Sequence, residues 1–192
     1  MQIKAVGFCG PQRVGKTTSA KHCSLEEQIP YIEVSASSVL AEHGCDAKTH
    51  YGIKERLFLQ KQILLSFTET WREALRRGPF VTDRTPLDIL AYTMCDVLRD
   101  FPLDLELEYY DLINTCLSVH REIFSHTVHV QPGINLVEDQ KSAPACLAYM
   151  EHFNAALLGA CAYYELKCFV MPRIVLSVED RHRHIALAFR WE

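Results

Sequence analysis

The chain has 192 residues, of which 48% are hydrophobic and 23% are charged, a composition typical of a globular domain that buries its own core. The formal net charge of −4 argues against a long nucleic-acid-binding groove, although a local basic patch is compatible with it. No apolar run approaches the roughly 20 residues of a membrane span. We therefore predict a single soluble domain over residues 1–192 that does not associate with membranes.

The N-terminus and the cysteines indicate the cellular compartment. Residues 1–4 lead directly into a predicted strand, which leaves no room for a signal peptide. Eight cysteines without an export signal are predicted to be reduced thiols, and none of them forms a C-x-x-C pair of the kind that holds zinc. We therefore expect a cytoplasmic protein with free cysteines.

The first predicted elements are a strand over residues 3–8, a loop, and a helix over residues 17–25. The loop, residues 10–17, reads Gly-Pro-Gln-Arg-Val-Gly-Lys-Thr and fits the pattern G-x-x-x-x-G-K-[ST] at every fixed position. Such a loop wraps a polyanion with backbone N–H groups and needs glycine where a Cβ would clash, while the helix N-terminus adds further donors. This phosphate loop predicts binding of a nucleoside triphosphate.

Two side chains of the phosphate loop have expected roles, because Lys16 would reach the β- and γ-phosphates and Thr17 would offer its hydroxyl to Mg²⁺. ATP and Mg²⁺ are therefore the expected cofactors. The alternative is a glycine-containing turn without a ligand, which the strand–loop–helix context disfavours. The residues predicted to bind the nucleotide are Gly10, Pro11, Gln12, Arg13, Val14, Gly15, Lys16, Thr17 and Thr18.

Strands and helices continue to alternate along the chain. A β-branched run predicts a second strand at 30–35, and apolar residues at helical spacing predict a long helix over 52–77, which Gly78 and Pro79 end. A third strand is predicted at 79–82. Thr85 as N-cap, Pro86 at the first helical position and Asp88 three residues after the cap then begin a helix that runs to about residue 98.

The remaining pattern predicts a helix over 103–124, a strand at 127–130, a polar loop at 135–144, a helix over 145–166, a strand at 168–171 and a C-terminal helix that begins near 177. Strands separated by helices predict an α/β fold of three layers, with a five-stranded parallel sheet flanked by helices. Ligands of such sheets bind at the carboxyl ends of the strands. Ser35, Asp83, Arg84 and Gln131 fall at these ends together with the phosphate loop.

Asp83 and Arg84 follow the third predicted strand. A carboxylate there can hold Mg²⁺ or take a proton from an acceptor hydroxyl, and the adjacent guanidinium can neutralise charge on a phosphoryl group. The predicted catalytic residues are thus Lys16, Asp83 and Arg84, and the predicted metal ligands are Thr17 and Asp83. The alternative for Asp83 and Arg84 is structural: a helix cap or a buried ion pair.

With these two motifs the chain resembles the P-loop kinases of nucleosides and nucleotides, which include deoxynucleoside kinases, thymidylate kinases, phage deoxynucleotide kinases and the kinase domain of nicotinamide-riboside-type enzymes. Residues 83–88, Asp-Arg-Thr-Pro-Leu-Asp, are similar to their D-R-[ST] signature, and the order of elements matches over nearly the whole chain. The resemblance implies the P-loop kinase fold and transfer of a phosphoryl group from ATP.

The resemblance also implies a lid and an acceptor pocket. The lid corresponds to about residues 134–144, where Lys141 is the only basic residue although arginine is usual in these kinases; Arg121 is an alternative phosphate ligand. The acceptor pocket lies by resemblance at the end of the second strand and on the long helix after it. Its candidate residues are Ser35, Ser37, Arg56, Gln60 and Gln62, each of which can instead belong to a solvated surface.

Three functions therefore compete. The first is an ATP- and Mg²⁺-dependent phosphotransferase that acts on a hydroxyl or phosphate of a nucleoside or nucleotide. The second keeps this chemistry but acts on a hydroxymethylated pyrimidine base within DNA, as phage-type DNA kinases do, and requires a basic surface. The third is a nucleotide-binding regulatory ATPase or a non-catalytic nucleotide-binding module.

A homodimer is possible, because the apolar helix over 145–166 can pack within the core or across an interface.

Overall fold

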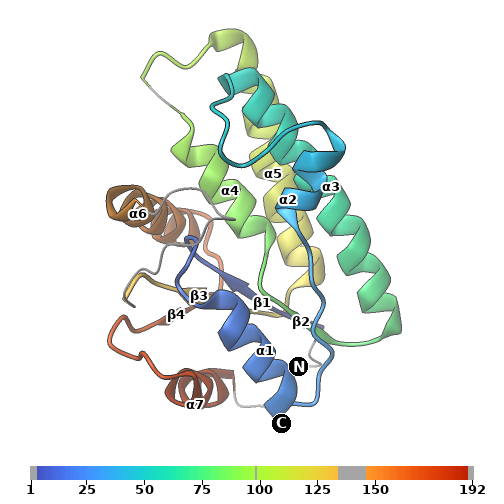
Figure 1. Cartoon of the computed structure of the whole chain (residues 1–192), viewed down its shortest axis with the longest axis vertical. Helices are drawn as coiled ribbons and strands as arrows, with labels where there is room; N and C mark the ends of the chain where they lie inside the picture. The colour runs from blue at the N-terminus through green and yellow to red at the C-terminus, as the bar shows by residue number, and fades with distance from the viewer. Residues whose placement is uncertain (1–3, 98, 134–145, 190–192) are drawn as a thin grey trace.

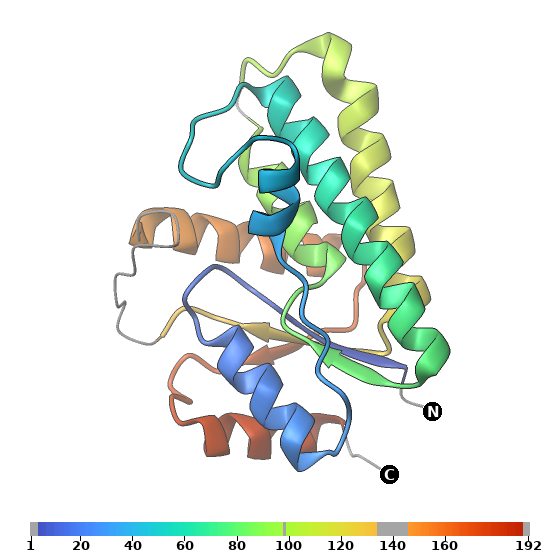
Figure 2. The same ribbon diagram turned by 45° about the vertical axis from the view of Figure 1, so that its right-hand side comes forward.

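The computed structural model describes residues 4–97, 99–133 and 146–189 of the chain. Their fold has three layers, a parallel sheet between two layers of helices (Figures 1 and 2). Four strands, β1 (Ala5–Cys9), β2 (Phe80–Thr82), β3 (His126–Val130) and β4 (Phe169–Met171), pair in the order β2-β1-β3-β4. All three pairings are parallel. The α/β class and the flanked parallel sheet predicted from the sequence are confirmed.

Helices cover both faces of the sheet, as Figure 2 shows most clearly. One face carries α3 (Ile53–Arg77), α4 (Pro86–Cys95), α5 (Glu106–Ile123) and α6 (Leu147–Tyr163), with the 3₁₀ turn η1 (Leu103–Leu105) leading into α5 and the short α2 (Ala36–Glu42) beside α3. The other face carries α1 (Lys16–Glu26) and α7 (Val178–Phe189). None of these helices, within the residues that the structure describes, is long and apolar enough to cross a membrane.

The core lies on both faces of the sheet because β1 is buried along its whole length. On the α3–α5 face, Trp71 packs edge-on against Phe67 and Phe124, with ring centroids 5.5 and 5.2 Å apart. On the α1–α7 face, Phe8 and Ile185 are fully buried. A strand buried on both faces reads as a continuous apolar run, and this is why β1 was recognisable in the sequence.

The predicted second strand at 30–35 is wrong in extent, and the sheet formed by the described residues has four strands rather than five. Only Tyr31 forms a bridge, to Val81, flanked by backbone hydrogen bonds in which Val81 donates to Pro30 and Ile32 donates to Val81. The chain then leaves the sheet edge, because Ser35 accepts a hydrogen bond from the backbone N–H of Ser38 and thereby caps α2. The sequence analysis had not predicted that helix.

The sheet places the functional segments at one edge. In the parallel register Cys9 lies beside His129, so that the loop after β1 begins next to the end of β3. The segment after β2, which begins with Asp83, reaches the same edge. The phosphate loop and the Asp83–Arg84 segment are therefore neighbours in space although about 70 residues separate them in the chain.

Two buried histidines generate a testable pH dependence of stability. Burial lowers the pKa of His120 to about 4, helped by the charge of Arg121, and burial lowers the pKa of His129 to about 4, helped by the charges of Lys16 and Arg173. Because both rings are neutral when folded but protonate near pH 6.5 when unfolded, the stability that they contribute is complete above pH 6.5 and is lost as the pH falls toward 4.

We expect the free energy of unfolding to fall by about 1–3 kcal/mol per histidine between pH 7 and pH 4.5. Urea titrations across this range measure it, and in His129→Leu the loss should be about half as steep. An unchanged slope in His129→Leu would show that folding does not lower the pKa of His129.

Candidate active site

The phosphate loop begins with Gly10, whose backbone adopts φ +137°. A Cβ there would lie 2.3 Å from the carbonyl oxygen of Val130, so both the conformation and the close approach to β3 require glycine. Gly15, in the left-handed region at φ 87°, is the N-cap of α1 and offers no side-chain acceptor to it. The first amides of α1 therefore have no capping side chain, and such amides bind anions.

Lys16 is buried, with 6% of its surface exposed, and its ammonium group points back into the loop. The Nζ atom donates to the carbonyl oxygens of Gly10 at 2.8 Å and of Pro11 at 2.7 Å. Burial and the nearby Arg84 guanidinium lower the pKa of Lys16 to about 8, against the opposing charges of Asp88 and Asp83. A cation held here by neutral carbonyl groups, which are weak partners for a full charge, is suited to exchange them for phosphate oxygens.

Asp83 meets the phosphate loop at its other end. The Thr17 hydroxyl donates to the Asp83 carboxylate, which is itself buried. Hydroxyl and carboxylate oxygens are the ligands that Mg²⁺ prefers, and Mg²⁺ normally completes its shell with water and phosphate oxygens. The two residues predicted as metal ligands are therefore brought together and fit the ion chemically.

Tyr31 joins this pair, which the sequence analysis did not foresee. Its hydroxyl donates a hydrogen bond to Asp83, and burial together with the negative charge of Asp83 raises the pKa of Tyr31, so that it stays a donor at neutral pH. Lys21 on α1 lies over the Tyr31 ring, 5.3 Å from its centroid. The single bridge that Tyr31 forms with Val81 fixes the ring beside β2. A strand-edge tyrosine carries no sequence signal for such a role.

Asp88 holds the first residue of the phosphate loop. Its Oδ1 accepts from the backbone N–H of Gly10 at 3.1 Å, and its Oδ2 accepts from the backbone N–H of Thr85 at 2.8 Å. The sequence predicted the capping box with Thr85, and the structure confirms it. The bond to Gly10 was not predicted, because the capping pattern contains no information on what else the carboxylate reaches.

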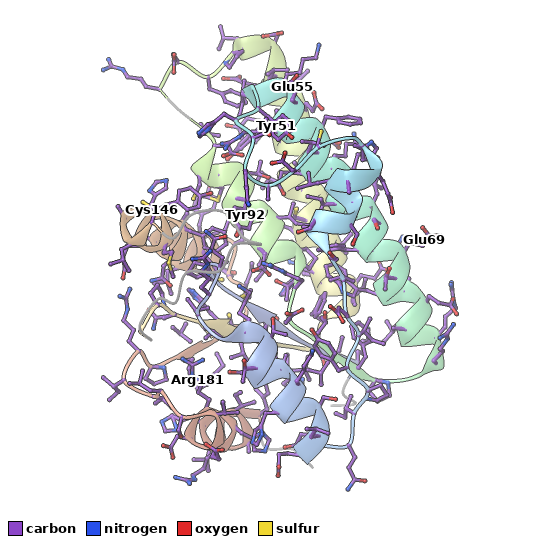
Figure 3. The ribbon with its side chains drawn as sticks, in the orientation of Figure 1. Tyr51, Glu55, Glu69, Tyr92, Cys146 and Arg181 are labelled. Carbon is purple, nitrogen blue, oxygen red and sulfur yellow. The ribbon has the colours of Figure 1, made fainter. Side chains whose placement is uncertain are left out.

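Arg84 lies beside Asp88 and Asp83, the opposite charges that favour its protonated form, and its guanidinium contacts the hydroxyl of Tyr92. Tyr92 projects from α4 toward α6 (Figure 3) and packs edge-on against Phe153, with ring centroids 4.6 Å apart. The ring thus belongs to the core, while its hydroxyl faces the charged segment. The three predicted catalytic side chains, of Lys16, Asp83 and Arg84, are gathered at one edge of the sheet.

Arg56, a predicted acceptor-binding residue, forms an ion pair with Asp96, the residue that ends α4. The Asp96 side chain is 8% exposed and that of Arg56 is 40% exposed. Burial raises the pKa of Asp96 to about 6, although the charge of Arg56 opposes this rise. Tyr149 on α6 lies close enough to Asp96, Arg56 and Tyr92 for their charges to act on its hydroxyl. The pair therefore connects α3 to α4 opposite the start of α6.

The other predicted substrate residues are dispersed. Ser35 is engaged as the cap of α2, and Gln60 lies half-buried one turn after Arg56 on α3. Arg121 lies near the amino ends of the strands, where its guanidinium donates to the carbonyl of Tyr164 at 3.1 Å, so the structure does not bring it to the phosphate loop. Lys141 and the predicted lid lie outside the described residues.

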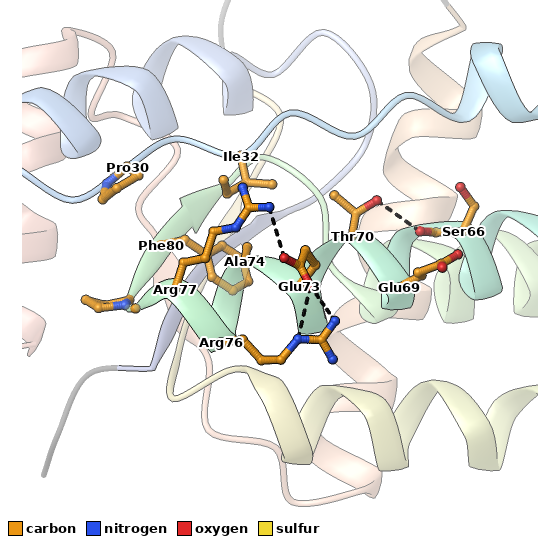
Figure 4. A pocket seen from close by; sticks show the side chains of 12 residues that line it. Pro30, Ile32, Ser66, Glu69, Thr70, Glu73, Ala74, Arg76, Arg77 and Phe80 are labelled. Carbon is orange, nitrogen blue, oxygen red and sulfur yellow. Dashed lines mark hydrogen bonds and ion pairs between the residues drawn. The ribbon is translucent and has the colours of Figure 1, made fainter.

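A pocket of about 580 Å³ lies away from this site (Figure 4). It is lined by the C-terminal half of α3, by Pro30 and Ile32 and by the start of β2, which is the amino end of the strand. Arg76 and Arg77 at its rim both bind Glu73. Because the pocket lies at the amino end of β2, whereas ligands of parallel sheets bind at the carboxyl ends, we assign the chemistry to the carboxyl edge instead.

Solved structures of other proteins share this fold. No family model matches the sequence, and no curated protein matches it. Deoxyadenosine kinase from M. mycoides with products dCMP and dCDP is 13% identical, with a TM-score of 0.64 over 97% of this chain and 98% of that one. Thymidylate kinase from Candida albicans is 12% identical, with a TM-score of 0.69 over 98% and 92%. The chain has the fold of the P-loop nucleoside and nucleotide kinases.

A further structure with the P-loop kinase fold is the NadR protein in complex with NR, which is 16% identical, with a TM-score of 0.70 over 98% of this chain and 50% of the NadR chain. At such low sequence identities, the similarity shows a shared fold. This shared fold confirms the resemblance to P-loop kinases that the phosphate loop and the Asp83–Arg84 segment had suggested.

The ion pair between Arg56 and Asp96 can be tested as a structural element. Arg56→Ala leaves a buried carboxylate without its partner and should destabilise the protein by about 1–3 kcal/mol. The double variant Arg56→Ala/Asp96→Asn should recover part of that loss. Urea unfolding at pH 7.5 measures both. If the single variant is as stable as the wild type, the pair contributes nothing to the fold.

Proposed function

We propose that this protein transfers the γ-phosphoryl group of ATP, with Mg²⁺, to a hydroxyl or phosphate group of a nucleoside or nucleotide. The observation that carries the proposal is the meeting of Asp83 with Thr17 of the phosphate loop, with Arg84 and Lys16 beside them. In phosphoryl transfer the protein mainly positions the reactants and stabilises charge. A compact group of two cations and a buried carboxylate next to an anion-binding loop is suited to that task.

Each residue has a distinct part in this proposal. The phosphate loop and the N-terminus of α1 bind the triphosphate, and Lys16 turns from the loop carbonyls toward the β- and γ-phosphates. Thr17 and Asp83 hold Mg²⁺, which neutralises phosphate charge when bound. Asp83 can alternatively receive the proton of the acceptor hydroxyl. Arg84 stabilises the charge of the phosphoryl group in transit.

The acceptor in this proposal lies beyond Arg84, between α4 and the starts of α3 and α6. Arg56, Asp96 and the two tyrosines Tyr92 and Tyr149 come together there from three helices. The Tyr149 ring supplies a stacking surface, and the tyrosine hydroxyls, the carboxylate and the guanidinium supply hydrogen-bonding groups that suit a nucleoside. The predicted lid with Lys141, which lies outside the described residues, would contribute a further cation to the transferring phosphate.

Substitution of the central residues tests the proposal. Lys16→Ala should lower phosphoryl transfer by at least about 100-fold in a folded protein, because a cation at the transferring phosphate is lost. Lys167→Ala removes an exposed lysine at the amino end of β4 and is the matched control, with wild-type activity expected. Full activity of a folded Lys16→Ala protein would refute the role assigned to the phosphate loop.

Asp83→Asn should reduce kcat by about 100-fold or more while the affinity for ATP changes far less, because the carboxylate acts on the reaction more than on the nucleotide. Equilibrium binding of ATP and initial rates with the same preparation separate the two effects. If activity per folded molecule is unchanged and only the melting temperature falls, Asp83 serves the fold alone.

The acceptor class follows from one assay with γ-labelled ATP, Mg²⁺ and three separate acceptor pools: nucleosides, nucleoside monophosphates, and DNA with hydroxymethylated pyrimidines. Label in one of the first two pools supports the proposal and names the acceptor class. Label in the DNA pool replaces it with the DNA kinase function. Label released only as inorganic phosphate identifies an ATPase instead.

A further inference from the structure

The turn between β2 and α4, residues 83–88, carries two carboxylates that accept hydrogen bonds from opposite ends of the phosphate loop. Asp83 accepts from Thr17, where the loop becomes α1, and Asp88 accepts from the backbone N–H of Gly10, where the loop leaves β1. Thr17 and Asp83 belong to the proposed metal site. Asp88 has no part in the function proposed above, and the question is what it does.

Asp88 is 2% exposed and has both carboxylate oxygens engaged. Oδ2 accepts from the N–H of Thr85, and the Thr85 hydroxyl lies 3.2 Å away from the same oxygen. Those contacts complete the cap of α4. Oδ1 serves a different element, because its partner Gly10 is 78 residues earlier in the chain. A cap alone would need only the first set of contacts.

The charges around Asp88 also connect it to the nucleotide site. Burial raises the pKa of Asp88, and the opposite charges of Lys16 and Arg84, both predicted catalytic residues, counteract this rise. Burial of an ionised group is costly unless it is paired and hydrogen-bonded, and Asp88 has two cations and two backbone donors. Asp88 is therefore close enough to the lysine of the phosphate loop and to the arginine of the β2–α4 turn for both charges to act on it.

We infer that Asp88 is a positioning residue that ties the start of the phosphate loop to the N-terminus of α4, so that the loop and Arg84 keep a fixed relative geometry. Gly10 has a φ of +137°, a conformation that favours glycine. Because the glycine backbone is also the most flexible of any residue, the hydrogen bond from Gly10 to Asp88 restricts the loop where it is least restricted otherwise. The inference rests on the proposed function, since it concerns the same nucleotide site.

The matched variants are Asp88→Ala and Thr85→Val. Asp88→Ala removes the bond to Gly10 and the carboxylate half of the cap. Thr85→Val keeps the side-chain shape and the backbone N–H that donates to Asp88, and it removes the hydroxyl that accepts from Leu87 and donates to Asp88 Oδ2. Both weaken the start of α4, so both should lower the melting temperature. Only Asp88→Ala should loosen the phosphate loop.

We expect Asp88→Ala to raise the Kd for MgATP, measured by calorimetry, and the KM for ATP at least tenfold, with the acceptor KM within twofold of the wild type. Thr85→Val should leave the Kd for MgATP within twofold. Asp88→Asn, which keeps an acceptor oxygen for Gly10, should raise the Kd less than Asp88→Ala does, and it carries the comparison if the alanine variant does not fold.

Wild-type affinity in Asp88→Ala, or in Asp88→Asn where only that variant folds, would overturn the inference, as would an equal loss of affinity in Thr85→Val. Failure of the proposed function gives a different pattern. A wild-type protein that binds MgATP but transfers to no acceptor refutes the kinase proposal and still allows the affinities of the variants to decide on Asp88. A wild-type protein that does not bind MgATP refutes both.

Discussion

The site depends on one constraint, the attachment of the β2–α4 turn to the phosphate loop. Strands β1 and β2 are neighbours in the sheet, so the segments that follow them leave the same edge together. Side-chain bonds then fix the distance that the sheet alone leaves adjustable: Thr17 to Asp83 and Gly10 to Asp88. The phosphate loop, which belongs to neither a strand nor a helix, is thus held at both ends by a turn about 70 residues away in the chain.

This attachment brings four charged side chains together at the carboxyl edge of the sheet: Lys16, Asp83, Arg84 and Asp88. Desolvation of so many ionised groups is unfavourable and is offset only where each finds an opposite charge or a backbone partner. Replacement of the cluster by apolar side chains would be expected to favour folding. Its retention is better explained by what it binds, since sites that hold highly charged ligands need charges arranged before the ligand arrives.

The elements that the sequence predicted well are those with a local signal. The run at residues 3–8 is apolar throughout because β1 is buried on both faces, and the spacing of apolar residues in 52–77 reflects one face of α3 packed on the core. The cap formed by Thr85 and Asp88 depends on residues three positions apart, so it was visible as well.

What the sequence could not reveal depends on contacts between distant segments. Residues 30–35 have the composition of a strand, yet only Tyr31 pairs with β2, since Ser35 already begins a helix. The bonds of Tyr31 and Asp88 to the site span 52 and 78 residues. Arg121 has a suitable charge for a phosphate, but the parallel topology puts the end of α5 at the opposite edge of the sheet. Charge and residue type are local properties, whereas the edge to which a residue is brought is not.

The four charged side chains at the centre of the site carry no net charge with which to bind a triphosphate. Lys16 and Arg84 are matched by Asp83 and Asp88, so the four groups sum to zero, and MgATP brings a net negative charge. Two other arginines near the carboxyl edge already face carboxylates: Arg56 faces Asp96, and Arg173 makes bonds of 2.6 and 2.7 Å to Glu151. An ion pair that must break before it binds phosphate contributes less than a cation without a partner. Arg13 within the phosphate loop and Lys141, the one basic residue in the sequence between Gly133 and Cys146, are the further cations that the sequence analysis predicts for the nucleotide and the transferring phosphate.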